Sequence, residues 1–530
     1  MKKHSNVELD IFQKFCLIIL ILSIFNRPTD GAKILGVFAY PAKSHFTFDS
    51  AILKSLANAG HEITVITSFP ADIAGENYTV IDTSNEFSIQ VANTSYDEFR
   101  KWSSYSLLPS GFSHEMPLCG KLWRRKEIQD MMNSKEKLFD VIFVEIFYLY
   151  KCLVPMAHKM KIPVIGTMTY KSWLTADIAS NNPCHPAYFP YENSLSFDQN
   201  SFYDRSLNVW NHISVYLFWY FRAIPFLNQF HKDNFQQIIP YSDYIKMEPS
   251  VIFYNSHHTF VSRPLNPNVI EVGGIHIKPA KPLPKNIKKF VEDAPNGVIL
   301  FTFGSLVKMS SLSKEIINIF FNAFAQIPQK VIMKYETPLE NVPKNVMVFD
   351  WLPQRDLLEH ENVIAFISHC GQGGVYEAIY TATPIVALPL IFDQLTSAMY
   401  LERLGVAVNL DIDFLTTGTL LKALDSIVND TRYQENMQKL SYAFKDRPLT
   451  PQQSVVYWTD YVIRHNGAHH LKPASSELNL LQYLLLDVII SFLVFLIVVL
   501  YFVYFILKFL YRFVFNFIRS SRGFQTKKDL

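Results

Sequence analysis

Short apolar segments of strand length recur along most of the chain, each bounded by polar or turn-forming residues. In the first half they cover residues 33–38, 62–66 and 139–146. In the second half they cover residues 298–303, 331–335, 345–349, 363–367, 385–388 and 406–410. Helical patterns separate most of them: residues 48–59 have helical periodicity, and residues 375–380 have a helix-compatible composition. Strands that alternate with helices predict an α/β fold with two doubly wound parallel sheets.

Two longer apolar runs differ from these strands. Residues 15–25 follow Lys2 and Lys3 and have the length of a signal-peptide core, too short to span a bilayer, so we predict a signal peptide over residues 1–31. A signal anchor is the alternative. Residues 488–507 carry no charge and have the length of one membrane-spanning helix. The basic tail over residues 508–530 then predicts a cytosolic C-terminus and a lumenal globular part.

A change of composition separates the two predicted domains. Prolines and paired glycines gather between residues 256 and 284, a composition typical of a linker. We predict an N-terminal domain over residues 32–275, a linker over 276–295 and a C-terminal domain over 296–465, whose last helices return across the boundary. The aromatic-rich residues 170–254 are predicted to form helices and loops over an apolar pocket.

Net charge, cysteine spacing and aromatic content limit which ligands and binding partners the sequence predicts. The formal net charge of +2 gives no electrostatic support for nucleic-acid binding. The five cysteines form no C-x-x-C pair, so we predict neither a zinc site nor a disulfide framework. Aromatic residues make up 15% of the chain, which suits a membrane anchor, a core and a pocket for a lipophilic ligand alike.

The most informative stretch is a strand, a glycine-rich turn and a helix start over residues 363–380. Glycines let the backbone approach a ligand closely, and the free N–H groups of a helix start attract a phosphate. His369 adds a donor at the mouth of the turn, and Glu377 lies about one helical turn further on. Asp393 and Gln394 follow the next strand, at the sheet edge where open α/β sheets bind ligands. Alone, the turn is equally well explained as structural.

Three further residues follow predicted strands. His45 follows the first strand, in the predicted loop before the first helix, Glu145 ends the strand at residues 139–146, and Ser305 follows the strand at residues 298–303. A lone loop histidine is usually just a solvated residue, and a strand-end carboxylate is on spacing alone equally well explained as solvated. Ser305 alone equally suits an ordinary β–α turn.

The ordered set of residues in the second half resembles the signature of the UDP-glycosyltransferase family, the membrane-associated animal enzymes that glycosylate small lipophilic molecules. That set is Trp351, Gln354, His369, Glu377, Asp393 and Gln394. The resemblance implies two Rossmann-like domains facing across a cleft, of the GT-B type. It also implies that uracil stacks on Trp351 and contacts Gln354, and that Glu377 binds the ribose. Asp393 and Gln394 would bind the sugar hydroxyls. The diphosphate would contact His369, Ser305, Gly371, Gly373 and Gly374.

The same resemblance implies a catalytic pair. The residues from Pro41 to His45 match the place where the family has its catalytic histidine, so His45 would be the general base. Glu145 stands where many members have the aspartate that orients this histidine. Two positions depart from the animal pattern, because Cys370 replaces a glycine, as in the plant branch, and Gly373 replaces an asparagine that can contact phosphate.

The resemblance implies an inverting transfer of a hexose from a UDP-sugar co-substrate to a hydroxyl of a small lipophilic acceptor, with no cofactor and no metal. An arthropod-like member would use UDP-glucose, and UDP-glucuronate is the alternative. Two other functions remain open: a non-catalytic membrane-bound carrier of lipophilic ligands, and a UDP-sugar transferase acting on a membrane lipid. The sequence also leaves open whether the chain forms a homo-oligomer.

Signals for location agree with this family. Lys527 and Lys528 resemble the dilysine signal that returns membrane proteins to the endoplasmic reticulum, which implies a single-pass type I protein of that membrane. Asn77, Asn93 and Asn429 each begin an N-x-S/T triplet and are candidate glycosylation sites on the lumenal side.

Overall fold

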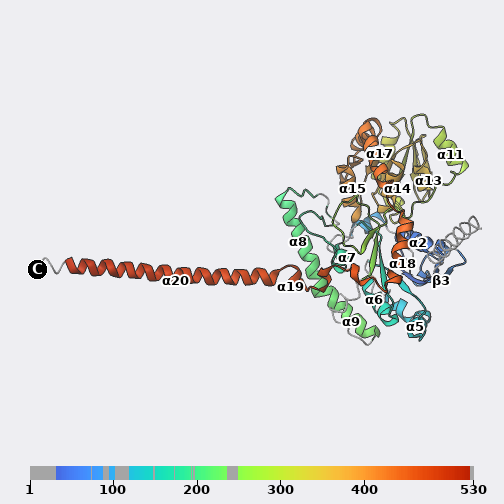
Figure 1. Cartoon of the computed structure of the whole chain (residues 1–530). Helices are drawn as coiled ribbons and strands as arrows, with labels where there is room; N and C mark the ends of the chain where they lie inside the picture. Colours follow the sequence, from blue (N-terminus) through green and yellow to red (C-terminus); the bar gives the residue numbers. More distant parts are fainter. Residues whose placement is uncertain are drawn as a thin grey trace, which may run out of the picture. The chain divides into compact units, whose positions relative to one another are not determined.

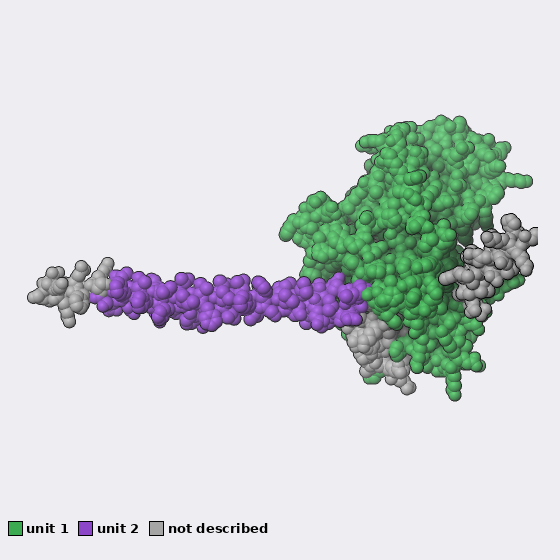
Figure 2. All heavy atoms as spheres, viewed as in Figure 1, with its two compact units in different colours: residues 1–472 green, residues 473–530 purple. Residues whose placement is uncertain are grey.

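The structure is a computed structural model. It describes residues 31–72, 75–87, 95–101, 119–146, 150–171, 174–191, 194, 197–235 and 249–525. The chain divides into two compact units, Met1–Lys472 and Pro473–Leu530, shown in green and purple in Figure 2. The predicted signal peptide, the triplet at Asn93 and the dilysine pair lie outside the described residues. These three remain predictions.

The first domain is built on a seven-stranded parallel sheet in the order β3-β2-β1-β4-β5-β6-β7. Its strands are β1 Lys33–Phe38, β2 Glu62–Thr67, β3 Tyr78–Asp82, β4 Val141–Glu145, β5 Val164–Met168, β6 Val251–Tyr254 and β7 Val269–Glu271. Its helices are α2 Lys43–Asn58, α3 Tyr96–Lys101, α5 Lys126–Asn133, α6 Tyr150–Met160, α7 Leu174–Ala179, α8 Phe202–Phe218 and α9 Ile224–Phe235, with a π-helical turn at Trp219–Ala223 between the last two. The central strands β4, β5 and β6 are buried along their whole length, as expected for a parallel sheet covered on both faces.

The second domain repeats the pattern with a six-stranded parallel sheet in the order β10-β9-β8-β11-β12-β13. Its strands are β8 Val298–Thr302, β9 Lys330–Lys334, β10 Val346–Phe349, β11 Val363–Ser368, β12 Ile385–Ala387 and β13 Ala407–Asn409. Its helices are α11 Lys285–Glu292, α12 Lys314–Phe324, α13 Gln354–Leu358, α14 Gln372–Thr381, α15 Asp393–Arg403, α16 Thr417–Asn429 and α17 Thr431–Lys445. The predicted fold of two parallel α/β domains is confirmed.

The differences from the predicted elements fall where polar residues or turns hide the pattern. Strands β3 and β5 were not predicted. Strand β6 lies in the aromatic-rich stretch predicted as helices and loops, and β7 lies in the proline- and glycine-rich residues 256–284. Helix α11 lies within residues 276–295, the predicted linker. Its Ile287 and Val291 are buried in the core of the second domain, so this part of the segment is packed structure.

The chain returns to the first domain at its end, as predicted. Helix α18, Pro451–Arg464, begins with a capping box at Thr450 and with proline in its first turn, both favourable at a helix start. Val455 and Val462 of this helix are buried in the same core as α2 and β6, and α18 lies beside α2 (Figure 1). The two domains are therefore connected twice: by the segment that follows β7 and by helix α18, which packs on the first domain.

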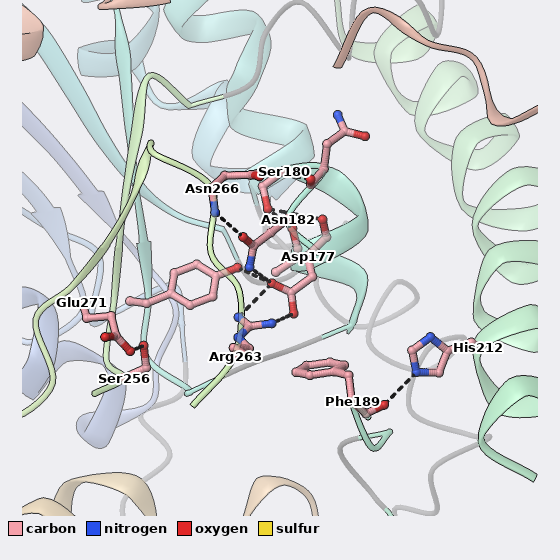
Figure 3. Close-up of polar contacts among 12 residues, drawn as sticks. Asp177, Ser180, Asn182, Phe189, His212, Ser256, Arg263, Asn266 and Glu271 are labelled. Atoms are coloured by element: carbon pink, nitrogen blue, oxygen red, sulfur yellow. Dashed lines mark hydrogen bonds and ion pairs between the residues drawn. The ribbon is translucent and has the colours of Figure 1, made fainter. Parts of the chain in front are cut away.

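The first domain contains a buried ion pair between Asp177 and Arg263 (Figure 3). The Arg263 guanidinium donates two hydrogen bonds to the Asp177 carboxylate, at 2.8 and 3.0 Å, and both side chains are almost fully buried. Tyr254 and Asn182 also donate to Asp177 Oδ1, at 3.0 and 2.8 Å. Such a pair is stable in the interior because each charge has both a countercharge and hydrogen bonds. It joins α7 to the segment that follows β6.

The second compact unit contains α19, Leu480–Tyr483, and the long helix α20, Leu486–Gln525. A candidate membrane span covers Leu486–Ser520, with a mean hydropathy of 3.0 and none of its apolar window buried. The apolar span predicted at residues 488–507 lies inside this helix. The helix continues through Lys508 and Arg512, so residues 508–525 of the predicted tail are helical. At about 1.5 Å per residue the candidate span exceeds the roughly 30 Å of a bilayer core.

One cysteine corrects the sequence analysis. Cys119, just before α5, is disulfide-bonded, although the cysteine spacing predicted no disulfide framework. This bond leaves no C-x-x-C signature in the sequence, so the cysteine spacing could not reveal it.

Candidate active site

The first sheet places His45 and Glu145 side by side. Strands β1 and β4 are neighbours, with Val37 opposite Val144, and the chain leaves them toward opposite sides of the sheet. Such a point is where open α/β sheets bind ligands. His45 lies in the first turn of α2, because the helix begins at Lys43, and the predicted loop position is wrong. Glu145 is the last residue of β4, as predicted.

Both nitrogens of the His45 imidazole have defined partners. Nδ1 is hydrogen-bonded to Glu145 Oε1, and both residues are buried, each with 6% exposure. A carboxylate accepts, so Nδ1 carries the proton and Nε2 is left as the acceptor. The Tyr170 hydroxyl lies 2.9 Å from Nε2, and the Thr169 hydroxyl donates to Glu145 Oε1 at 2.9 Å. A base held in one tautomer by an oriented carboxylate is the arrangement that proton abstraction requires.

A second carboxyl group lies close to this pair. Asp49 is one helical turn after His45 in α2 and is almost fully buried. Burial raises its pKa well above the usual range, and the charge of Glu145 adds to that shift. Burial therefore disfavours the charged form of Asp49, and Glu145 is the carboxylate that contacts the imidazole.

The second sheet places the glycine-rich turn next to the loop after β8. Strands β8 and β11 are neighbours, with Thr302 opposite Ser368. The His369 ring packs against the backbone of Gly304 and Gly371, and a Cβ atom at Gly304 would lie 2.6 Å from His369 Cε1. Glycine is required at Gly304 for a second reason, since its φ is +72°. The ring is thus held at the start of α14 by residues that cannot carry side chains.

His369 is arranged to meet a ligand. Its Nδ1 atom is buried and has no hydrogen-bond partner. Burial, and then the positive charge of Lys334, lower the pKa of His369 to about 4, so the ring is neutral. Lys334, at the end of β9, donates to the Gly304 carbonyl at 2.8 Å and pairs with Glu336 at 3.2 Å. A lysine, helix-start amides and an imidazole at one sheet edge form a suitable environment for a diphosphate.

Glu377 lies one turn into α14 and is held by two neighbours. Gln354 donates to its Oε2 at 2.6 Å, and His276 Nε2 lies 3.9 Å from its Oε1. The same His276 nitrogen donates to the Gly373 carbonyl at 3.2 Å, so this imidazole fills space beside the glycine that replaces an asparagine. Burial raises the pKa of Glu377 to about 7, whereas Gln354 and Arg355 oppose the shift.

The remaining donor residues differ in exposure. The Trp351 side chain is 55% exposed, so its ring has an open face for stacking. Ser305 is partly exposed in the turn after β8, and Gly374 lies against the Gln354 amide, which a Cβ atom there would approach to 3.1 Å. These positions are compatible with the predicted contacts to a nucleotide.

Asp393 and Gln394 begin helix α15 and are buried. Phe392, the residue before them, has a φ of +57°, a conformation that side chains rarely adopt and that sites often use for positioning. Gln394 Oε1 accepts from the Leu390 amide at 3.0 Å, which leaves its Nε2 to donate. Burial raises the pKa of Asp393, and the electrostatic effects of Lys171 and His45 oppose that shift. The carboxylate of the second domain is thus electrostatically coupled to the histidine of the first.

The structure therefore brings the predicted residues together in two linked groups, one at the edge of each sheet. Sequence reasoning missed Thr169, Tyr170, Lys171, His276 and Lys334. Lys334 ends β9 and the first three follow β5, so position at the carboxyl end of a strand could have indicated them. The candidate glycosylation residues Asn77 and Asn429 are exposed, at the start of β3 and the end of α16.

Solved structures share this architecture. A structure of Arabidopsis thaliana UGT89C1 complexed with UDP-L-rhamnose matches 83% of this chain and all of its own, with a TM-score of 0.56 and 14% identity. The glycotransferase of kitacinnamycin matches 82% of this chain and 98% of its own, with a TM-score of 0.54 and 16% identity. The fold is accordingly that of the GT-B glycosyltransferases.

The sequence comparisons identify the family. Residues 33–521 match the family described as UDP-glucoronosyl and UDP-glucosyl transferase, and the chain belongs to it. UDP-glucosyltransferase 2 of Dactylopius coccus is 36% identical over 89% of this chain and 92% of its own length. UDP-glucuronosyltransferase 2B7 of Homo sapiens is 31% identical over 90% and 93%. The protein is a UDP-sugar glycosyltransferase, as the sequence motifs predicted.

Proposed function

We propose that this enzyme transfers glucose from UDP-glucose to a hydroxyl group of a small lipophilic acceptor, with inversion at the anomeric carbon and with His45 as the general base. The observation that carries this proposal is the pair of partners on the His45 imidazole. Glu145 holds the proton on Nδ1, and Nε2 is left to take a proton at the edge of the first sheet.

In this mechanism His45 Nε2 removes the proton from the acceptor hydroxyl as its oxygen attacks the anomeric carbon. The bond from that carbon to the β-phosphate oxygen breaks, and UDP leaves. Glu145 stabilises the imidazolium that forms. The Tyr170 hydroxyl, 2.9 Å from Nε2, lies at the distance that the acceptor hydroxyl must reach, so it has to move when the acceptor binds.

The charge of the leaving UDP would be stabilised on the second domain. The start of α14 offers backbone amides and the positive end of a helix dipole, and Lys334 adds a positive charge beside His369. Glu377 would accept hydrogen bonds from the ribose, and Trp351 would stack on uracil. Asp393 and Gln394 would bind the sugar hydroxyls. No cofactor or metal has a role in this proposal.

Glucose is proposed over glucuronate because the Dactylopius coccus relative, named a glucosyltransferase, is more similar to this chain than the human glucuronosyltransferase. The carrier hypothesis rested on Glu145 and Gly373. The contact of Glu145 with His45 and the His276 imidazole beside Gly373 both argue against it.

We also propose a single-pass type I protein of the endoplasmic reticulum, anchored by α20, with the catalytic domains in the lumen and the dilysine tail in the cytosol. The disulfide at Cys119 supports this location, because disulfides persist in oxidising compartments. Asn77 and Asn429 are exposed, as glycan attachment requires.

The test is UDP release from UDP-glucose and from UDP-glucuronate, each with a panel of phenols, steroids and lipids, in membranes that contain the wild-type protein or the His45→Ala variant. We expect His45-dependent release with UDP-glucose and a phenol or steroid, and unchanged UDP binding in the variant. Activity with UDP-glucuronate but not with UDP-glucose would change the proposed donor. Activity with lipids but not with phenols or steroids would change the proposed acceptor. Activity that survives His45→Ala would refute the base.

A further inference from the structure

The loop after β5 contributes three consecutive side chains to the centre of the proposed site. Thr169 donates to Glu145, and the Tyr170 hydroxyl lies beside His45. Both contacts stay within the first domain. Lys171 instead reaches helix α15 of the second domain, so it is the member of this loop that links the two groups of site residues.

The Lys171 contact is short, polar and almost fully buried. Its side chain is 1% exposed, and Nζ donates to the Asp393 carbonyl at 2.8 Å and to Ser397 Oγ at 2.7 Å. Ser397 Oγ donates in turn to the same carbonyl at 2.7 Å. Burial of an ammonium group is costly, and two domains can pack through apolar residues without that cost. A buried lysine at this position therefore indicates a role in addition to holding the two domains together.

The group that Lys171 serves is the Asp393 carboxylate. Asp393 is only 5% exposed, and its buried Oδ2 atom has no hydrogen-bond partner. Lys171 and, to a lesser extent, His45 stabilise the charged form of this carboxylate electrostatically. A buried carboxylate that keeps one oxygen without a partner, next to the proposed base, is arranged to accept a hydrogen bond from a polyhydroxyl ligand.

We propose that Lys171 is a positioning residue of the donor-sugar subsite, which holds the first turn of α15 and the Asp393 carboxylate opposite His45. This inference rests on the proposed function. It means that the acceptor domain completes the subsite for the hexose, whereas the nucleotide contacts of Trp351, His369 and Glu377 lie in the second domain alone. Loss of Lys171 should therefore weaken UDP-sugar and spare UDP.

The experiment compares wild type with Lys171→Met, Lys171→Arg and the control Ser397→Ala. Binding of UDP and of UDP-glucose is measured by calorimetry, and kcat and KM by UDP release. For Lys171→Met we expect UDP affinity within about twofold of wild type and a donor KM at least about tenfold higher, the loss typical of a charged hydrogen bond. Ser397→Ala retains the ammonium and should change KM by less than about threefold.

The pH profile separates positioning from simple packing. Without Lys171 the Asp393 carboxyl loses a countercharge, so the acidic limb of kcat/KM should move up by about one pH unit. The other titratable groups that act on this carboxylate are His45 and the Cys370 thiol, whose pKa is raised by burial and which stays protonated. Lys171→Arg retains the charge and should leave the limb in place.

The outcomes are distinct. Lys171→Met with wild-type KM and an unmoved acidic limb overturns the inference, and so does an equal loss of UDP and UDP-glucose affinity. If wild type releases no UDP from either sugar donor, the proposed function fails, and the difference between UDP and UDP-glucose affinity still tests Lys171. If Lys171→Met does not fold, Lys171→Arg decides: a raised KM at unchanged UDP affinity supports the inference, and an unchanged KM overturns it.

Discussion

The hydrogen bond between His45 and Glu145 predicts a large catalytic effect of the Glu145→Gln substitution. Glutamine has the same length and can still contact Nδ1, and the Thr169 hydroxyl can still hold its oxygen at the position it has now. What changes is the charge. A neutral amide cannot stabilise the imidazolium that forms when Nε2 takes the acceptor proton.

The size of the effect follows from the contact and its burial. Both side chains are nearly inaccessible to water, with 8% and 7% of their surface exposed. Two unit charges about 4 Å apart attract by about 4 kcal/mol at an effective dielectric constant of about 20. The amide dipole recovers part of this, which leaves about 3 kcal/mol. That loss corresponds to about a 100-fold lower kcat.

The assay is the initial rate of UDP release at saturating acceptor. Glu145→Gln should lower kcat about 100-fold, with the donor KM and the UDP affinity within about twofold of wild type, because Glu145 does not belong to the nucleotide subsite. Thr169→Val is the matched control. It removes one hydrogen bond to the carboxylate, worth about 1 kcal/mol, and should lower kcat only about fivefold. A Glu145→Gln enzyme within threefold of wild type, beside an inactive His45→Ala, would refute the reasoning.

Four further predictions concern the buried charges and the apolar helix. UDP-glucose binding should tighten as the pH rises through about 7, where Glu377 ionises, and Glu377→Gln should abolish this dependence in calorimetry between pH 6 and 8. Because burial raises the pKa of Glu377 from 4.5 to about 7, ionisation of this carboxyl destabilises the folded protein as the pH rises from 4.5 through about 7. Glu377→Gln should therefore increase the free energy of unfolding at pH 8 by about 3 kcal/mol in urea titrations. A decrease would contradict the burial argument. Arg263→Met leaves Asp177 buried without its countercharge and should lower that free energy by about 3–5 kcal/mol, partly restored by adding Asp177→Asn; no change would mean that the pair is dispensable. Truncation before Asp487 removes α20 and should give a protein that fractionates with the soluble phase; continued membrane association would assign a bilayer contact to the remaining chain.

Much of the fold could be read from hydrophobic periodicity alone. Every strand predicted in the second half is present, with ends that differ by at most one residue, because these strands are apolar and are separated by clear turn residues. Four strands of the first domain were missed: β3, β5, β6 and β7. The neighbours of β6 and β7 are aromatic or proline-rich, and such composition masks a short extended segment. Helix α2 begins at Lys43, five residues earlier than its periodicity indicated, because its first turn includes polar residues.

The candidate donor residues could be picked out from the sequence because all of them except Ser305 lie within one continuous stretch from Trp351 to Gln394. Local order determines which of them follow a strand and which begin a helix, and parallel strands bring those positions to one edge. The family membership follows from the same residues. The acceptor side has no such stretch, and Glu145 stood 100 residues from His45 with no local signal that the two would meet.

The amino-acid sequence by itself determined the two α/β domains, the apolar C-terminal helix and the nucleotide-binding motif, because each depends on neighbours in the chain. Only the tertiary structure decided which atoms of different segments meet. It placed Glu145 on Nδ1 of His45, the His276 imidazole beside Gly373, and the Lys171 ammonium on the first turn of α15. These contacts join residues 97 to 222 positions apart, and their geometry depends on how strands order within a sheet and how two domains pack, which no local pattern encodes.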